Sequence, residues 1–465
     1  MKKKIIIYGI GTIFSKILVF LMVPIYTRLF STEDYGYYDV IISDVQMLIS
    51  ICYVEIWSGI LRFMFLNKKK EIAIKCYLKL FPYMSVLYLI ILWGISKYIY
   101  IRYPIITFFY GILYLAYTVG NTICRGYEKN TDYVLSGMAY TFLSCICSIF
   151  FSVVFNLGIR GLFEAQCIGY MVSVIYVEIR TSAIKNALKV KITKDDIKDL
   201  LRYSIPLMFN SFSFLLLGTY NKNLILKYLG ENESGLYAFV LKFSAVFSIL
   251  ISIYSLAWQE QAFSVAEGEN KAKIYSYYVN KFLKIIGLAV PGFILISYIM
   301  APIIGGKNYY VSNTYIALSV SAAYISEISG ILSVIIAVGK KTLQTFLSTL
   351  MGAIVNIILV HHLILNFGVN GSSFALNIGF LVATIIRYLF IKKEIPIKFQ
   401  LRYMACYFIE LIIFIIITKI TKSLLLWIYC PAIGIIWLSV NYKDIKSIVL
   451  DIKNNLRREK HYEKD

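Results

Sequence analysis

Charged residues are scarce in this sequence. They make up 16% of the 465 residues, whereas a soluble globular domain carries about 25%. Hydrophobic residues reach 59%, and the mean hydropathy is +0.71. A soluble chain with so much apolar surface would precipitate, so the composition excludes a soluble globular protein and indicates an integral membrane protein.

Long hydrophilic segments are missing as well. The two longest pieces between or after the apolar runs are 181–202 and 442–465, and both read as short basic amphipathic helices at the membrane surface. Neither is long enough to fold as a catalytic domain. The pattern therefore argues against an enzyme with an extramembrane domain.

Metal-binding patterns are also absent. The chain has three His and eight Cys, and the cysteines fall within or at the ends of apolar runs. His361 and His362 are adjacent and project to different faces of a helix, and Cys145 and Cys147 are too close along a helix to form a disulfide. We therefore expect no metal and no cofactor.

Apolar runs of about 20 residues, the length that crosses a bilayer, recur along the whole chain. Strands of a membrane β-barrel would instead alternate polar and apolar residues. The sequence predicts an all-α integral membrane protein with about fourteen transmembrane helices. The predicted spans are 5–28, 38–64, 76–96, 104–124, 133–156, 162–180, 203–227, 236–262, 280–303, 313–338, 343–366, 371–391, 401–420 and 424–441.

Basic residues set the predicted orientation. Lys and Arg number 47 against 26 Asp and Glu, and most of them lie in alternate loops, on the side of the N-terminal MKKK. By the positive-inside rule, both termini are predicted to be cytoplasmic. The net charge of +21 then reflects topology and anionic lipid. Because the charges are spread over separate segments, we expect no nucleic-acid partner.

Two short patterns occur twice. Residues 28–38 read RLFSTEDYGYY and residues 227–237 read KYLGENESGLY, and the same separation relates Gly36 to Gly235 and Tyr38 to Tyr237. A second pair, NLGIRG from Asn156 and NFGVNG from Asn366, recurs at a similar separation.

Both pairs lie six predicted spans apart, so the halves enter the membrane in the same direction. The sequence thus predicts two parallel six-helix lobes, 1–200 and 201–400, related by a pseudo-two-fold axis along the membrane normal, and an appended helix pair with a basic tail, 401–465.

A chain of six, six and two spans resembles the Wzx-type oligosaccharide flippases of the polysaccharide transporter family. That family lies within the superfamily that includes the multidrug and toxic-compound extruders. The most recognisable segments are GIGTIFSKILVFLMVPIYTRLFSTEDYGYYDV and the later YLGENESGLYAFV.

The resemblance implies a V-shaped pair of lobes in the bacterial cytoplasmic (inner) membrane. A cationic central cavity would accept an undecaprenyl-diphosphate-linked oligosaccharide and release it across the bilayer by alternating access. The expected partners are this substrate and membrane lipids, together with other glycan-assembly proteins.

Charged residues inside spans each cost roughly 2.5–3.5 kcal/mol and need a reason. In the second span, Asp44, Glu55 and Arg62 are spaced to share one helix face. In the eighth span, Lys242 and Glu260 also share a face. Two interpretations remain: these residues line a cavity, or Asp44 pairs with Lys242 and Arg62 with Glu260 as salt bridges between the lobes.

Three further cations are candidates for holding a diphosphate. Lys16 lies in the middle of the first span, Lys222 in the outer half of the seventh, and Arg125 ends the fourth on the cytoplasmic side. A lysine is a sufficient point-charge partner for a phosphate. Lys222 is also close enough to a span end to reach the interface, and Arg125 also fits an ordinary positive-inside anchor.

Isolated acids mark candidate coupling sites. Glu327 lies midway along the tenth span and Glu410 in the thirteenth. A buried carboxylate can take up H⁺ or bind Na⁺, and a structural cation partner elsewhere in the bundle is the alternative. Either ion, or the substrate gradient alone, is compatible with the sequence.

Three functions compete at this point. The first is a flippase for a lipid-linked glycan and the second a cation-coupled drug or toxin extruder on the same scaffold. The third is a membrane glycan polymerase or ligase, which would need a long external loop that this chain lacks. Lys16, Lys222 and Lys242 favour an anionic cargo and hence the flippase.

Overall fold

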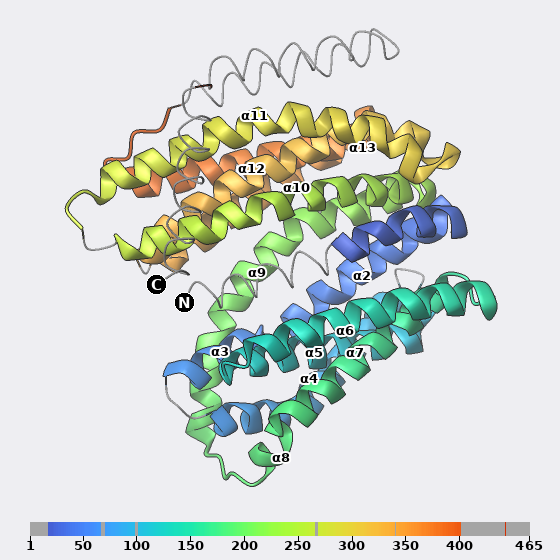
Figure 1. Cartoon of the computed structure of the whole chain (residues 1–465), viewed down its shortest axis with the longest axis vertical. Coiled ribbons are helices and arrows are strands. Elements are labelled where there is room, and N and C mark those ends of the chain that lie inside the picture. Colours follow the sequence, from blue (N-terminus) through green and yellow to red (C-terminus); the bar gives the residue numbers. More distant parts are fainter. Residues whose placement is uncertain are drawn as a thin grey trace, which may run out of the picture.

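The computed structural model describes residues 17–66, 70–97, 101–265, 268–339, 341–400 and 442. All regular elements in this part of the chain are helical (Figure 1). They are a helix Ile17–Leu29, α2 (Thr32–Cys52), α3 (Ile56–Leu66), α4 (Lys70–Ser96), α5 (Pro104–Gly126), α6 (Asn130–Ile149) with the π-helical η1 (Phe150–Val154), α7 (Ile159–Thr181), α8 (Ala183–Leu188), α9 (Lys194–Leu229), α10 (Glu231–Ser264), α11 (Lys271–Gly305), the 3₁₀ helix η2 (Lys307–Ser312), α12 (Asn313–Val338) and α13 (Thr342–Lys392).

Local sequence explains where several helices begin. The hydroxyl oxygen of Ser31 accepts a hydrogen bond from the backbone N–H of Asp34 at the start of α2. Thr193 and Asp196 form a reciprocal capping box at the start of α9, and α5 begins at Pro104. The first N–H groups of a helix have no partner within the helix. The Ser31 and Thr193 side chains each accept a hydrogen bond from one of these groups, whereas proline has no N–H group to satisfy.

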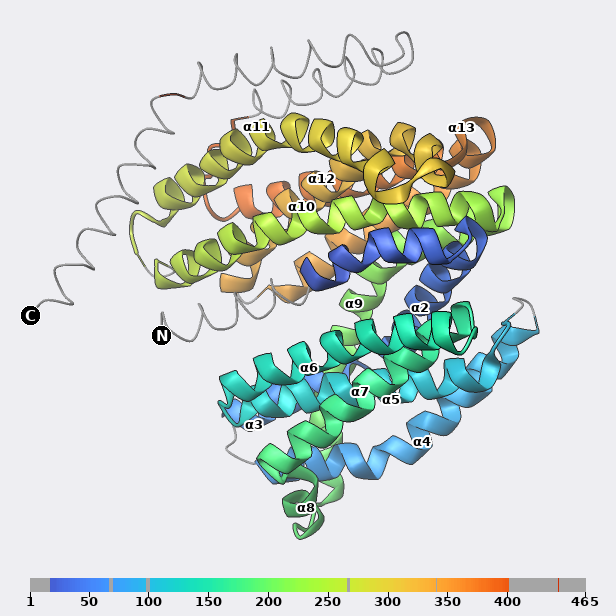
Figure 2. The same ribbon diagram turned by 45° about the vertical axis from the view of Figure 1, so that its right-hand side comes forward.

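The helices form two stacks (Figures 1 and 2). One stack contains α3 to α8, and the other contains α10 to α13 with helix Ile17–Leu29 beside α10. One cluster of buried hydrophobic side chains consists of residues between Phe30 and Leu200. The other consists of residues between Leu236 and Ile397 and also includes Val23 and Tyr35. The lobe boundaries at 200/201 and 400/401 stay predictions.

Two helices connect the stacks. Helix α2 packs on both α10 and α9, while α9 packs on α3 near its start and on α13 further along. Helix α9 bends by 42° between Ser213 and Leu215. We call the end of the bundle at which α2 and α10 begin the Gly36 end, and the opposite end, at which α9 begins, the Lys194 end.

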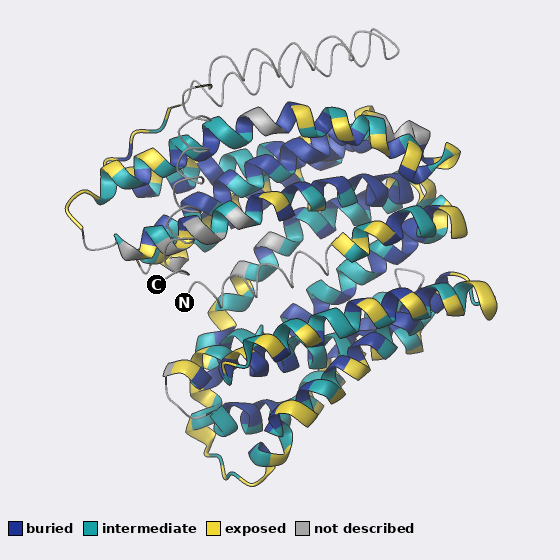
Figure 3. Ribbon diagram, viewed as in Figure 1, coloured by how far each residue is buried: buried dark blue, intermediate teal, exposed yellow. Residues whose placement is uncertain are grey.

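Exposed residues lie along the outer sides of the helices (Figure 3), and many of them are large and hydrophobic. Large hydrophobic side chains are exposed along several helices, for example Trp93 at 63% and Ile179 at 73%. In water such a surface would drive aggregation, whereas in a bilayer it contacts lipid tails. This pattern confirms a multi-pass membrane protein.

Eight helices of the described part are long and apolar enough to cross a membrane, and two bent pairs raise the number to ten. Helix α13 counts once among them but contains two predicted spans. A Cβ added at Gly352 would lie 2.5 Å from the carbonyl oxygen of Gly379, so its halves run antiparallel about Gly368. The predicted spans 401–420 and 424–441 lie outside the described residues, and the number fourteen stays a prediction.

The NLGIRG and NFGVNG segments adopt the same turn. Gly158 has φ 54° and ψ −137°, and Gly368 has φ 58° and ψ −138°. Residues with a side chain are essentially barred from this region of backbone conformation. Two halves that make an identical glycine turn before their sixth predicted helix support the internal repeat, although the pseudo-two-fold rotation itself stays a prediction.

The first repeated motif meets its own copy. A Cβ added at Gly36 would lie 2.4 Å from the backbone nitrogen of Gly235, and one added at Gly235 would lie 1.8 Å from the carbonyl oxygen of Thr32. Helices α2 and α10 therefore cross in direct backbone contact at these two glycines. The two copies of the motif thus pack against each other at the interface between α2 and α10.

Candidate functional site

The helix expected over 38–64 is broken. Val54 and Glu55 have φ angles of 45° and 51°, and the axes of α2 and α3 differ by 54°. Side chains on the two sides of such a break no longer follow one helical count, so the prediction that Asp44, Glu55 and Arg62 share one face is wrong. Each of the three lies in different surroundings.

Glu55 sits in the break and faces a cavity between the two stacks. Its Oε1 accepts a hydrogen bond of 2.9 Å from the hydroxyl of Ser58. Left-handed backbone at a residue other than glycine is uncommon and is enriched at functional sites. The break turns this carboxylate away from lipid and toward the interior of the bundle.

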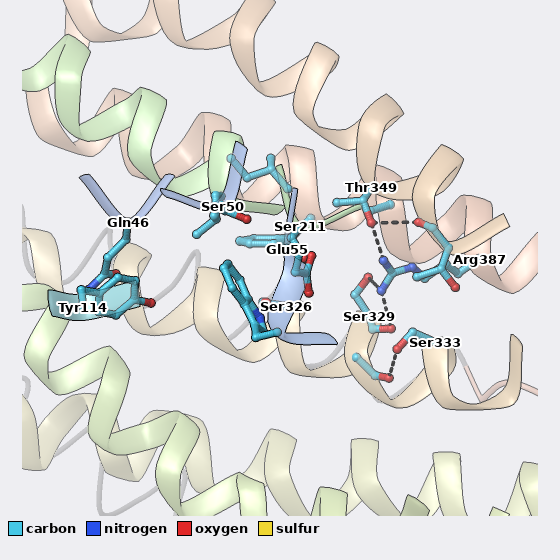
Figure 4. Close-up of a pocket in the computed structure, with 17 residues that line it drawn as sticks. Gln46, Ser50, Glu55, Tyr114, Ser211, Ser326, Ser329, Ser333, Thr349 and Arg387 are labelled. Carbon is cyan, nitrogen blue, oxygen red and sulfur yellow. Dashed lines mark hydrogen bonds between the residues drawn. The ribbon is translucent and has the colours of Figure 1, made fainter. Parts of the chain in front are cut away.

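The cavity that Glu55 faces has a volume of about 490 Å³. We call it the central cavity. Hydroxyl side chains from both stacks dominate its polar lining (Figure 4). The lining residues are Gln46, Ser50, Glu55, Trp57, Tyr114, Ser211, Leu215, Leu217, Ser326, Ser329, Gly330, Ser333, Thr345, Thr349, Phe380, Ala383 and Arg387.

Arg387, in the second half of α13, lies across the central cavity from Glu55 (Figure 4). Its side chain is buried, with 7% of the residue exposed. Nε donates to the hydroxyl of Ser348 at 2.9 Å, and Nη2 donates to the hydroxyl of Thr349 at 2.6 Å. Nη1 donates to the carbonyl and hydroxyl oxygens of Ser329 at 2.7 and 2.8 Å.

All these acceptors of Arg387 are uncharged. A guanidinium has five N–H donors, and the described residues take up four of them. A buried arginine is normally paired with an anion, because an uncompensated charge in the membrane interior is costly. The arrangement thus leaves a fixed positive charge at the cavity wall, held in place by hydroxyl groups.

A second group of charges joins α2 to α9 and α10. Asp39 accepts hydrogen bonds from Nζ of Lys222 at 2.6 Å and from Nζ of Lys242 at 3.1 Å. Nζ of Lys222 also donates to Ser43 at 2.8 Å, and Nδ2 of Asn223 donates to Asp44 at 2.5 Å. We call these six residues the Asp39 cluster. Its two carboxylates and two ammonium groups balance formally.

The Asp39 cluster revises the expected pairing. Lys242 bonds to Asp39 in place of Asp44, and Asp44 bonds to an amide. The predicted pair Asp44–Lys242 is therefore wrong, and Lys242 pairs with a different acid of α2. Asp39 lies at the edge of the predicted span, where an acid usually belongs to the loop, so the sequence does not single it out.

The other predicted site residues are dispersed. The guanidinium of Arg62 lies 4.0 Å from the ring centre of Tyr203 on α9, and Arg125 is exposed at the end of α5. Neither is among the described residues that line the central cavity. Glu327 is half-buried on α12, next to the cavity-lining Ser326.

Three predicted site residues remain beyond the description. Lys16 and Glu410 lie outside the described residues, as does the side chain of Glu260. The predicted pair Arg62–Glu260 therefore stays a prediction.

The Gly36 end holds the two stacks together. Nη1 of Arg102, in the loop before α5, bonds to Asp34 of α2 at 2.6 Å, and Nη2 bonds to Glu231 of α10 at 2.5 Å. The hydroxyl of Thr32 also bonds to the side chain of Asn232. Together with the Gly36–Gly235 crossing, these contacts close this end of the interface between the stacks.

Solved structures with the same fold are membrane transporters. A lipid II flippase, MurJ, in an inward closed conformation has a TM-score of 0.68 at 15% identity, with 95% of this chain and 99% of that chain covered. An inward-facing MATE-family multidrug resistance transporter has a TM-score of 0.62 at 16% identity, with 82% of this chain and 94% of that chain covered. A MOP-superfamily transporter from Pyrococcus furiosus has a TM-score of 0.58 at 16% identity, with 85% of this chain and 96% of that chain covered.

The fold of this chain is the one that these transporter structures share. A family model described as "Polysaccharide biosynthesis protein" matches residues 1–259, which is more than half of the chain. This chain belongs to that polysaccharide biosynthesis family. No curated protein sequence matches it.

Proposed function

We propose that this chain is a flippase, which moves an oligosaccharide linked to a lipid by a diphosphate across the bacterial cytoplasmic membrane. The observation that carries the proposal is Arg387, a buried cation on the wall of the central cavity whose hydrogen-bond acceptors among the described residues are all uncharged. Guanidinium groups bind phosphate oxygens in a bidentate manner. A diphosphate entering the cavity would supply the anion that Arg387 lacks.

The family and the fold support this proposal. The family is named for polysaccharide biosynthesis, and one structural relative is named as a flippase of lipid II. The cargo we propose is the repeat unit of an O-antigen, a capsule or an exopolysaccharide, carried on undecaprenyl diphosphate. We assign the chain no catalytic step, and we expect it to work beside other glycan-assembly proteins.

Transport would proceed by alternating access. We place the Lys194 end and both termini in the cytoplasm, as the basic loops predict, so that the central cavity opens toward the cytoplasmic leaflet while the Gly36 end is closed. Lys222 and Lys242 would be released from Asp39 when the stacks separate, and would then offer their charges to the diphosphate. Lys16 remains a candidate for the same role.

Coupling to an ion is a separate part of the proposal. Glu327, next to the lining of the central cavity, and Glu410 remain candidates for H⁺ or Na⁺ coupling. A carboxylate that binds an ion in one state and pairs with a lysine in another would link ion movement to the change of state.

The test compares Arg387→Ala and Arg387→Lys with a control, Arg160→Ala, which removes an exposed arginine paired within α7 to Glu164. Each variant is reconstituted in vesicles with a fluorescent polyprenyl diphosphate that bears a short glycan, and its movement between leaflets is timed. We expect Arg387→Ala to slow flipping at least tenfold, Arg387→Lys to retain part of it, and the control to match the wild type. Wild-type flipping in Arg387→Ala would refute the role of Arg387.

An extruder of cationic compounds is the second candidate, and Glu55 favours it because its carboxylate also lines the central cavity. The variant Glu55→Gln distinguishes the two functions. A flippase should tolerate this change and still require Arg387, whereas an extruder of cations should lose transport of a dye such as ethidium. Ethidium export by the wild type that depends on Glu55 would favour the extruder.

A further inference from the structure

A second cavity lies closer to the Gly36 end. Its volume is about 180 Å³, and it is lined by helix Ile17–Leu29, α2, α5, α6 and α7, together with Lys242 of α10. It shares the lining residue Gln46 with the central cavity, so the two adjoin. Six tyrosines line it: Tyr26, Tyr35, Tyr38, Tyr110, Tyr140 and Tyr170. We call it the tyrosine cavity.

The polar atoms of the tyrosine cavity are held in fixed positions. The hydroxyl of Tyr140 donates to Oε1 of Gln166 at 2.5 Å, and Nε2 of Gln166 donates to the hydroxyl of Tyr38 at 3.1 Å. The rings of Tyr140 and Tyr170 stack with centres 4.5 Å apart at 9°. Such a framework needs no reorganisation before it contacts a ligand.

The lining selects the chemistry of an occupant. In the closed arrangement the charged groups of the lining, Asp39 and Lys242, are bonded to each other, and Asp39 is also bonded to Lys222, so neither a phosphate nor a cation finds an unpaired partner there. The phenol and amide groups of the lining keep hydrogen-bonding capacity beyond their bonds to each other, and an alkyl chain would leave that capacity unused. A ligand with polar hydroxyl edges and an apolar face fits both requirements, and a pyranose ring has this character.

Size gives a further restriction. Pockets for drug-sized ligands measure roughly 300–1,000 Å³, so a cavity of about 180 Å³ suits a single ring. The central cavity, next to it, holds Arg387. A lipid-linked glycan would then extend its sugar toward the Gly36 end while its diphosphate stays at Arg387.

We propose that the tyrosine cavity is a subsite for one sugar ring of the glycan, in which tyrosine faces contact the ring and the Tyr140–Gln166–Tyr38 chain bonds its hydroxyls. The inference rests on the proposed flippase function. It makes one sugar of the glycan a determinant of affinity, whereas Arg387 recognises the diphosphate shared by all such lipids.

The experiment measures binding of two kinds of probe to the full-length protein in detergent. One is a polyprenyl diphosphate, and the other is the same lipid carrying glycans of one to four sugars, built from hexoses or N-acetylhexosamines. Tyr140→Phe and Gln166→Met remove single hydrogen-bonding groups and keep the volume. Tyr117→Phe is the matched control. The ring centre of Tyr117 lies 4.8 Å from that of Tyr140 and 5.0 Å from that of Tyr170, but Tyr117 is not among the described residues that line the cavity.

We expect the wild type to bind at least one sugar-bearing probe about tenfold more tightly than the bare diphosphate, a difference of about 1.4 kcal/mol. Tyr140→Phe and Gln166→Met should remove this preference without changing affinity for the bare diphosphate, and Tyr117→Phe should keep it. Equal binding of all probes by the wild type, or a preference that survives both variants, would overturn the subsite and leave the flippase standing. Failure to bind any probe would overturn both.

Discussion

Replacing Gly235 by alanine should shift the protein toward a state in which the Gly36 end is open. The new Cβ would lie 1.8 Å from the carbonyl oxygen and 2.6 Å from the carbonyl carbon of Thr32. Ordinary van der Waals contact begins at 3.4 Å, so α2 and α10 must separate by roughly 1.6 Å at this crossing. Both clashing atoms belong to the backbone and cannot rotate away.

The size of the effect follows from packing energetics. Forcing one extra carbon into a close-packed interface costs about 1–3 kcal/mol, and each 1.4 kcal/mol is a factor of about ten in an equilibrium constant. The closed arrangement should lose about fivefold to 150-fold in population relative to a state in which the crossing is open. Gly36→Ala should act in the same direction, since its Cβ would lie 2.4 Å from the nitrogen of Gly235.

The assay is a distance measurement across the Gly36 end. Spin labels are placed on cysteines introduced at Arg160 and Lys307, which are exposed on opposite stacks, in a background without the native cysteines. Gly235→Ala should increase the fraction of long distances. Gly94→Ala is the control, because a Cβ at this helical glycine meets nothing within 4 Å.

An unchanged distance distribution in a folded Gly235→Ala protein would refute the reasoning, because the crossing would then tolerate a methyl group without separating. The control also corrects for the gain in helix propensity that any change from glycine to alanine brings.

Two further predictions concern the Asp39 cluster and the topology. The change Asp39→Asn removes the carboxylate to which Lys222 and Lys242 bond, so we expect it to lower the melting temperature of the protein in detergent. The double variant Asp39→Asn, Lys242→Gln should recover part of that loss. An unchanged melting temperature in the single variant would contradict a structural role for these ion pairs. A reporter fused after residue 190 or at the C-terminus should be cytoplasmic, and a reporter inserted within 303–312 should be external. Finding the N-terminus and the C-terminus on opposite sides of the membrane would contradict the predicted orientation.

Local patterns explain which parts of the fold could be predicted from the sequence. The length of an apolar run fixes a span whatever it packs against, so the predicted spans 203–227 and 236–262 fall within α9 and α10. Turn chemistry is equally local. The repeated Asn-x-Gly pattern anticipated the matching turns at Gly158 and Gly368, because only glycine adopts that backbone conformation without strain.

The candidate site was less predictable because it depends on contacts between distant helices. The break at Val54 and Glu55 contains neither glycine nor proline, and no local signal marks it. Asp39 lies at the edge of one predicted span and Arg387 near the end of another, where charges usually mark the interface with water. Only the packing of α2 against α10 and of α13 against α12 places these two residues in the interior.

Arg102 makes the opening of the Gly36 end sensitive to ionic strength. It bonds to Asp34 on its own side of the interface and to Glu231 on the other, and about a quarter of its side chain is exposed. When the stacks part, Arg102 can keep Asp34 and lose only Glu231, so opening never strands the arginine without a carboxylate. Exposed ion pairs are screened by dissolved salt. The rate at which this end opens should therefore rise with ionic strength on the side it faces, which would make turnover sensitive to the salinity of the medium.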